Sequence, residues 1–494
     1  MHAPQLESDY LIVGSGAAGM AFADTIFHES SATMTIVDRH HGPGGHWNDA
    51  YPFVRLHQPS SFYGVNSRKL GNDGYDTDPL NAGMTERASS AEILSYYETL
   101  MQQMVTSGRV RYLPMSNVEV RDASSASNTY VIRSLLSGAT TQVHVHRKVV
   151  DTSWLNTGVP STHPPKYAVA DGVQCMPLND LARVKRPPSG YVVVGAGKTG
   201  IDACLWLLAN QVPADMIRWV MPRDSWFLNR ANVQASDAFF VQTFDAMATQ
   251  FEAIAQAQSM PQLFQKLEAT GQLLRLDPAV EPGMYHAAVV SQAELQQLRS
   301  IKDIVRLGRV TRIDTNTITL EHGTAPMDAD RIVVDCSASA AEKRDAVPVF
   351  QGRTITLQFI KAHQPTLSAA LIAHVELRDT LDEAGKNKLC KPVPMPDTPI
   401  TWLTMLAATM SNRDQWGKDQ DIAQWLVNAR LDAFAKMMDS VQEHELEKVA
   451  LMERMGAAVQ AAVKQFKVLL NPGHRMASGD AAQRNVHGDV AALV

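Results

Sequence analysis

The sequence is poor in cysteine and has no long apolar run. Its four cysteines (Cys175, Cys204, Cys336 and Cys390) form no C-x-x-C pair. That scatter argues against a disulfide framework and against a redox-active dithiol. No stretch reaches the roughly 18 uninterrupted apolar residues of a membrane span. The N-terminus lacks the basic and apolar regions of a signal peptide. We therefore expect a cytoplasmic protein without a membrane span.

Charge excludes further classes of partner. The formal net charge is −6, with 45 Lys and Arg against 51 Asp and Glu. This balance gives no reason to expect nucleic acid or an acidic membrane as partner.

His144 and His146 share a strand face, but no third ligand follows, so we expect no metal site. With 494 residues, the chain can form two or more domains with sizeable cores.

The opening stretch carries the strongest motif. An apolar run that ends at Val13 predicts a buried strand, and the glycines at 14, 16 and 19 complete a G-x-G-x-x-G frame before a helix-forming run. Gly14 permits the tight turn, Gly16 lets the backbone approach a pyrophosphate, and Gly19 lets helix and strand pack closely. A second strand ends at Asp38, where a carboxylate accepts hydrogen bonds from a ribose. The sequence predicts a dinucleotide site here.

A glycine-rich loop and a polar stretch follow Asp38. Gly45, His46 and Trp47 belong to a loop that we expect to fold over a flat ligand. Beyond it, Gln58 is predicted to hydrogen-bond a heterocycle. Three residues are candidates to supply charge or protons near such a ligand. Arg55 and His57 lie in this stretch, and Arg230 lies further along the chain.

The opening pattern recurs about 180 residues later. A strand over 191–194 leads into Gly195-Ala-Gly-Lys-Thr-Gly200 and a helix. After the next strand, Arg223 stands where an acid would hold a free 2′-hydroxyl, so we expect NADP(H) in preference to NAD(H). The predicted contacts to this second nucleotide are the motif residues and three cations: Gly195, Gly197, Lys198, Thr199, Gly200, Arg218 and Arg223.

These motifs predict an α/β protein with two Rossmann-like dinucleotide-binding domains, a helical insertion and a helical C-terminal region. We expect residues 1–155 and 331–494 to form a discontinuous FAD-binding domain, and residues 156–330 to form the NADP(H)-binding domain. The insertion spans about 231–300, with helices over 238–256 and 262–274. Apolar stripes in the C-terminal helices suit a core or a contact in a homo-oligomer. From Asn471 onward we expect a mobile tail.

The order of these motifs resembles that of the class B flavoprotein monooxygenases, which include flavin-containing, Baeyer–Villiger and N-hydroxylating enzymes. The resemblance lies in the motif at 14–19, Asp38, GGHW at 44–47, YP at 51–52 and VVVGAGKTG at 192–200. It implies FAD at the first motif and NADPH at the second. It also implies reduction of the flavin by NADPH, activation of molecular oxygen as a C4a-peroxyflavin, and transfer of one oxygen atom to a small-molecule substrate. By position, Trp47 would pack beside the flavin and Arg223 would hold the 2′-phosphate.

Two departures from that pattern keep alternatives open. The F-x-G-x-x-x-H fingerprint of these families is replaced by the histidine-free segment 167–175, and Cys336-Ser-Ala stands where alanine-threonine-glycine is usual. One alternative is an FAD- and NAD(P)H-dependent oxidoreductase that transfers hydride without inserting oxygen. Another is a protein that binds both dinucleotides without turnover.

Overall fold

The computed structural model describes residues 5–119, 128–234, 236–338, 342 and 344–471. The predicted tail lies outside these residues, except for Asn471. Within the described part of the chain, no helix combines the length and the apolar character needed to cross a membrane.

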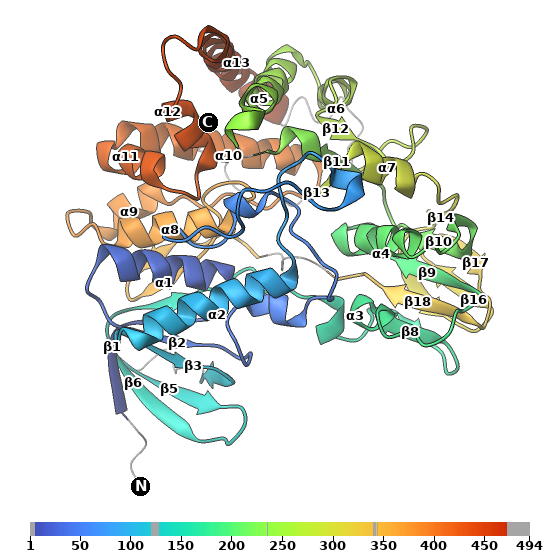
Figure 1. The fold of residues 1–494 in the computed structure, drawn as a ribbon, viewed down its shortest axis with the longest axis horizontal. Coiled ribbons are helices and arrows are strands. Elements are labelled where there is room, and N and C mark those ends of the chain that lie inside the picture. The colour runs from blue at the N-terminus through green and yellow to red at the C-terminus, as the bar shows by residue number, and fades with distance from the viewer. Residues whose placement is uncertain (1–4, 120–127, 235, 339–341, 343, 472–494) are drawn as a thin grey trace.

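A large sheet forms one side of the molecule (Figure 1). Its central strand β1 pairs in parallel with β2 and β6, β2 pairs with β3, and β6 pairs with β20. Three further strands add antiparallel pairs, β19 to β20, β5 to β6 and β4 to β5. Tyr10, Leu11 and Ile12 of the apolar run before the first motif are fully buried in β1, as its composition predicts. The bounds are β1 Gln5–Val13, β2 Met34–Val37, β3 Val110–Leu113, β4 Ser116–Val118, β5 Thr129–Ser134, β6 Thr140–Asp151, β19 Phe350–Gln351 and β20 Thr354–Thr356.

Helices α1 and α8 lie side by side against this sheet. Helix α1 (Ala17–Glu29) begins at the first glycine motif, and α8 (Pro365–Glu376) is buried along almost its whole length. Helix α2 (Ser90–Thr106) begins with a capping box between Ser89 and Glu92, in which each side chain accepts from the other residue's backbone N–H.

The second sheet is parallel throughout, in the order β14-β10-β9-β18-β8. The unit β9–α4–β10 repeats the unit β1–α1–β2, because α4 begins at the second glycine motif as α1 begins at the first. The predicted α/β fold with two Rossmann-like sheets is confirmed. The bounds are β8 Gln174–Pro177, α3 Leu178–Leu181, β9 Gly190–Val194, α4 Lys198–Ala209, β10 Ile217–Val220, β14 Asp303–Val305 and β18 Arg331–Asp335.

Two small sheets accompany the second domain. One has the order β17-β16-β15-β7, and the other has the order β12-β11-β13. The bounds are β7 Ala168–Val169, β11 Ser225–Asn229, β12 Leu273–Leu274, β13 Met284–Val290, β15 Val310–Ile313, β16 Thr317–Leu320 and β17 Gly323–Pro326.

The insertion is helical as predicted, but one helix is shorter than expected. Helices α5 (Phe240–Gln256), α6 (Met260–Ala269) and α7 (Gln292–Leu298) form it. The predicted helix over 262–274 is wrong at its end, because Gly271 adopts φ +70° and the chain continues into strand β12. A left-handed glycine after the last turn is a common helix stop.

The C-terminal helices close over the insertion. Helix α13 packs along α5, and both contribute to a shared apolar core with α6 and α10. The bounds are α9 Glu383–Leu389, α10 Pro399–Lys418, α11 Gln420–Asn428, α12 Ala433–Asp439 and α13 Leu446–Leu470. We keep 155/156 as a proposed domain boundary. The boundary predicted at 330/331 is wrong, because β18 (Arg331–Asp335) pairs with β8 and β9 and so belongs to the second sheet.

Candidate functional site

The first glycine motif forms a tight turn between β1 and α1. Gly14 has φ +107°, and a Cβ there would collide with the hydroxyl of Thr152. A Cβ at Gly19 would collide with the carbonyl oxygen of Gly14, so helix and strand are packed as closely as backbone allows. Gly16 is the N-cap of α1 and offers no side chain to its first turn. The N–H groups of that turn therefore have no side-chain cap.

The second motif repeats this geometry. Gly195 has φ +129° and lies against Cys336, while a Cβ at Gly200 would collide with the carbonyl oxygen of Gly195. Gly197, the N-cap of α4, differs, because no heavy atom would lie within 4 Å of a Cβ there. The second motif therefore has open space at the N-terminus of its helix.

The glycine-rich loop folds back onto the first motif, and its predicted place over a ligand stays a prediction. The N–H of Gly44 donates to the carbonyl of Ser15 at 2.9 Å. Gly45 has φ +58°, and a Cβ there would lie 2.8 Å from the Cα of Gly16. Trp47 is buried, and its Nε1 donates to the hydroxyl of Tyr63 at 2.7 Å.

Asp38 lies at the end of β2, beside the first motif. One carboxylate oxygen accepts from the N–H and the hydroxyl of Ser15 at 2.5 and 2.7 Å, and the other accepts from the N–H of His40 at 2.8 Å. The ring of His40 lies between Asp38 (2.9 Å) and Asp49 (2.7 Å). Burial acts to raise the pKa of Asp38, but the hydrogen bonds from His40 and Ser15 hold it below its ordinary value. A ribose hydroxyl would have to compete with these donors, so the ribose role stays a prediction.

Two other predicted contacts of the first nucleotide lie nearby in the chain. The ring of His46 lies tilted against that of Trp47 with ring centroids 5.1 Å apart, and burial lowers the pKa of His46 to about 4. Gln58 is half-buried in the loop that follows. Their contact with a nucleotide stays a prediction.

Direct contacts join the two glycine-motif units. The hydroxyl of Tyr51, in the loop of the first domain, donates to Asp202 Oδ2 of helix α4 at 2.6 Å. Lys198, the residue of the second motif with a charged side chain, forms an ion pair with the same Asp202. Phe53 stacks on Trp206 of α4 with ring centroids 4.6 Å apart. The first-domain loop after Trp47 therefore seats on the helix that begins at the second motif.

A buried ionic cluster lies at the same junction. Glu294 accepts from Arg230 at 2.9 Å and lies 3.6 Å from Arg87, which also pairs with Asp76 at 2.5 Å. Arg87, Arg230 and Glu294 are each 5% exposed or less. The second guanidinium nitrogen of Arg230 donates to the carbonyl of His57. Arg230 is one of the residues predicted from the sequence. Arg87 and Glu294 are not, because no local pattern links positions 87, 230 and 294.

His57 lies where these cations meet. Burial, followed by the charges of Lys198 and Arg230, holds the pKa of His57 well below its usual range. Its Nδ1 is buried and has no hydrogen-bond partner among the described residues. The imidazole is therefore neutral and has a free hydrogen-bonding position at the junction.

The remaining predicted cations differ in how strongly they are held. Arg55 donates to the carbonyl of Arg87 at 2.9 Å. Arg218 is committed to Asp303 at 2.9 Å, because the two residues are register partners on β10 and β14. Arg223 is exposed and has no hydrogen bond or ion pair with any described residue. Of the arginines predicted for a 2′-phosphate, Arg223 has the free guanidinium.

Unpartnered polar atoms gather at the start of α8. The Oε1 of Gln364 and the Oγ1 of Thr366 are buried without partners in the described chain, as is the Nε2 of His363. His363 adopts φ +56°, an uncommon conformation for a residue with a Cβ. No sequence motif marks His363 or Gln364.

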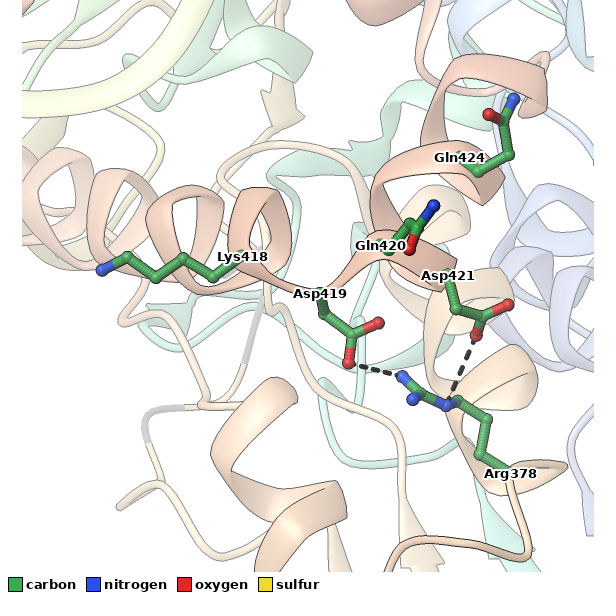
Figure 2. Close-up of a pocket in the computed structure, with 6 residues that line it drawn as sticks. All are labelled: Arg378, Lys418, Asp419, Gln420, Asp421 and Gln424. Atoms are coloured by element: carbon green, nitrogen blue, oxygen red, sulfur yellow. Dashed lines mark hydrogen bonds and ion pairs between the residues drawn. The ribbon is translucent and has the colours of Figure 1, made fainter.

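A surface hollow near the C-terminal helices does not belong to this junction. It is lined by Arg378, Lys418, Asp419, Gln420, Asp421 and Gln424. Figure 2 shows Arg378 between Asp419 and Asp421, at 2.7 and 3.3 Å. Its lining includes no residue of either glycine motif, and its arginine is already paired. Within the described ranges, no group of His, Cys, Asp and Glu side chains is arranged to hold a metal ion.

Comparison with known proteins identifies relatives of this chain. An uncharacterized protein of Mycobacterium tuberculosis (strain H37Rv), Rv2000, is 44% identical over 463 residues, which are 92% of this chain and 84% of that protein. The chain belongs to the same family as Rv2000. Residues 12–57 match the family of NAD(P)-binding Rossmann-like domains.

Among solved structures, cyclohexanone monooxygenase from Rhodococcus sp. Phi1 bound to NADP+ matches with 11% identity and a TM-score of 0.48, over 94% of this chain and 99% of that one. A flavin-containing monooxygenase from Stenotrophomonas maltophilia matches with 13% identity and a TM-score of 0.43, over 75% and 98% of the two chains.

Proposed function

We propose that this protein is an FAD- and NADPH-dependent monooxygenase that acts on a small organic molecule with molecular oxygen. The observation that carries the proposal is the pair of strand–glycine-motif–helix units joined by Tyr51 and Asp202. Two dinucleotide-binding units joined in this way suit an enzyme in which one nucleotide passes hydride to the other.

FAD fits the residues around the first motif. Gly16 and Gly45 approach each other so closely that a side chain on Gly45 would fill the space. The uncapped start of α1 suits a pyrophosphate, and the unpartnered Gln364 and Thr366 suit the polar edge of a heterocycle. When bound, FAD would accept hydride and pass electrons to oxygen. Asp38, Gly14, Gly19, His46, Trp47 and Gln58 complete the proposed contacts.

NADPH fits the second motif. The open space at Gly197 leaves room for a phosphate at the N-terminus of α4, where N–H groups and the helix dipole favour an anion. The exposed guanidinium of Arg223 is free to bind a 2′-phosphate. Gly195, Thr199 and Gly200 would shape the turn, and Lys198 would hold Asp202 beside it.

His57 and Arg230 are the proposed catalytic residues at the junction, together with Arg55. The neutral imidazole of His57 can donate or accept a proton at its buried Nδ1. Arg230 fixes the His57 backbone through its carbonyl and brings positive charge to the junction. Arg55 brings a second positive charge to the polar stretch that contains His57.

Oxygen incorporation tests this proposal. The protein is supplied with FAD, NADPH, labelled oxygen gas and a panel of ketones, amines and sulfides, and the label in the product is measured together with hydrogen peroxide. Labelled product supports a monooxygenase. NADPH oxidation with peroxide or reduced acceptor as the sole product would favour the oxidoreductase that inserts no oxygen.

A further inference from the structure

The link between α11 and α12 contacts two separate loops beside the proposed flavin site. This link consists of residues 429–432. Its Arg430 reaches the segment 61–65, and its Asp432 reaches Lys361, just before α8. No motif pointed to this link, and the proposed function assigns it no role.

Among the described residues, the hydrogen bonds of the Arg430 side chain all go to backbone carbonyls. Its Nη1 donates to Ser61 at 2.7 Å, its Nη2 donates to Tyr63 at 2.9 Å, and its Nε donates to Val65 at 3.0 Å. The hydroxyl of Tyr63 in turn accepts from Trp47 of the glycine-rich loop. A single planar guanidinium therefore fixes the backbone that carries the partner of Trp47.

Asp432 is fully buried and holds the other loop. Its carboxylate accepts from Lys361 at 3.0 Å and from Arg413 at 2.8 Å. The same loop is tied by Asn412, whose amide donates to the carbonyl of Ile360 at 2.8 Å. These ties end directly before His363, the residue in a left-handed conformation.

The residues directly after this loop include a strained backbone conformation and unpartnered polar atoms. His363, Gln364 and Thr366 each have a buried polar atom without a partner among the described residues. A non-glycine residue with positive φ persists only where its surroundings hold it, and such residues cluster at ligand sites. The ion pair of Asp432 with Lys361 and the hydrogen bond of Asn412 to Ile360 hold the backbone next to His363.

We propose that Arg430 and Asp432 are positioning residues of the flavin site, each fixing one of the two loops that present polar groups to FAD. This inference rests on the proposed function, because it takes FAD as the ligand. The C-terminal helices are then part of the site and not only its cover.

The test compares four variants with the wild type, one of which, Asp432→Asn, probes the second loop. Arg430→Met keeps most of the side-chain length but removes every donor. Arg430→Lys restores the charge on a single donor nitrogen, without the planar fork. Arg454→Gln is the control. Arg454 also joins distant elements, by pairing with Asp245 and Glu252 on α5, but it touches neither loop. FAD affinity is measured by flavin fluorescence, and the bound flavin by its visible spectrum.

We expect Arg430→Met to weaken FAD binding by about tenfold, which corresponds to roughly 1.4 kcal/mol, and to shift the spectrum of the flavin that remains bound. Arg430→Lys should recover part of the affinity, and Arg454→Gln should match the wild type. Hydrogen exchange should rise at residues 61–65 in Arg430→Met, and at residues 360–364 in Asp432→Asn. If Arg430→Met does not fold, Arg430→Lys alone carries the test, with a smaller loss expected.

Two failures are distinguishable. A wild-type protein that does not bind FAD overturns the proposed function and this inference with it. A wild type that binds FAD, with Arg430 variants of unchanged affinity, spectrum and exchange, overturns this inference alone.

Discussion

The hydroxyl of Tyr51 donates a hydrogen bond of 2.6 Å to the carboxylate of Asp202, and this contact joins the loop of the first domain to the helix of the second motif. Asp202 also holds Lys198, so one carboxylate serves both units. The relative placement of the two glycine motifs depends on contacts of this kind.

Removing the hydroxyl tests that dependence. Tyr51→Phe should lower the free energy of unfolding by about 1.5–3 kcal/mol, the range for a hydrogen bond to a charged group. It should also raise the KM for NADPH while FAD affinity stays unchanged, because the first motif is untouched. Urea denaturation and steady-state kinetics measure both. A variant with wild-type KM would show that the junction does not depend on this bond.

Two glycines of the second motif should respond oppositely to alanine. Gly197→Ala enters open space and should leave stability unchanged, yet it should abolish NADPH binding by blocking the approach of the phosphates. Gly200→Ala meets the carbonyl of Gly195 and should cost at least about 1–3 kcal/mol of stability. Thermal unfolding and NADPH titration distinguish them. Equal behaviour of the two variants would contradict the assigned roles.

Loss of the buried carboxylate of Glu294 should lower the free energy of unfolding more than loss of the surface carboxylate of Glu252. Glu294→Gln leaves Arg230 and Arg87 without their shared counter-charge, so the free energy of unfolding should fall by about 3–5 kcal/mol. Glu252→Gln removes a surface partner of Arg454 and should cost less than about 1 kcal/mol. Denaturant unfolding of both variants provides the comparison, and similar losses would argue against a buried ionic cluster.

Acid should destabilise the protein partly through buried neutral histidines. Burial lowers the pKa of His46 and of His363 from 6.5 to about 4. Between those values the unfolded chain binds a proton that the native state does not, so stability falls as the pH falls. Each group contributes a slope of up to about 1.4 kcal/mol per pH unit. His40, whose pKa Asp38 raises, acts in the opposite direction.

His363→Asn isolates one of these groups, since asparagine tolerates the left-handed conformation. The variant should lose stability less steeply than the wild type between pH 6.5 and about 4. Urea denaturation across that range measures the difference. Parallel curves would show that His363 titrates near its ordinary value in the folded protein.

Local features of the site follow from the sequence. The two glycine motifs, the strand and helix around each, and the fold-back of the loop at Gly45 all depend on residues close together in the chain. Such features are predictable because turn geometry and helix starts are set by nearby residue types.

Contacts between residues far apart in the chain could not be predicted from the sequence. Arg87 and Glu294 meet only because the insertion folds against the first-domain loop, and Arg430 reaches residues more than 360 positions away. Arg218 was predicted to help bind phosphate, but the neighbouring strand brings Asp303 to it. The helix predicted to reach Leu274 ends early because Leu273 and Leu274 pair with β11.

Anaerobic addition of NADPH to the FAD-loaded protein tests the central claim most directly. If both nucleotides bind and their reactive rings meet at the junction, the visible absorbance of the flavin should bleach on mixing, and it should return when air is admitted. A protein that takes up no FAD, or one whose flavin spectrum is unchanged by NADPH, would contradict the account.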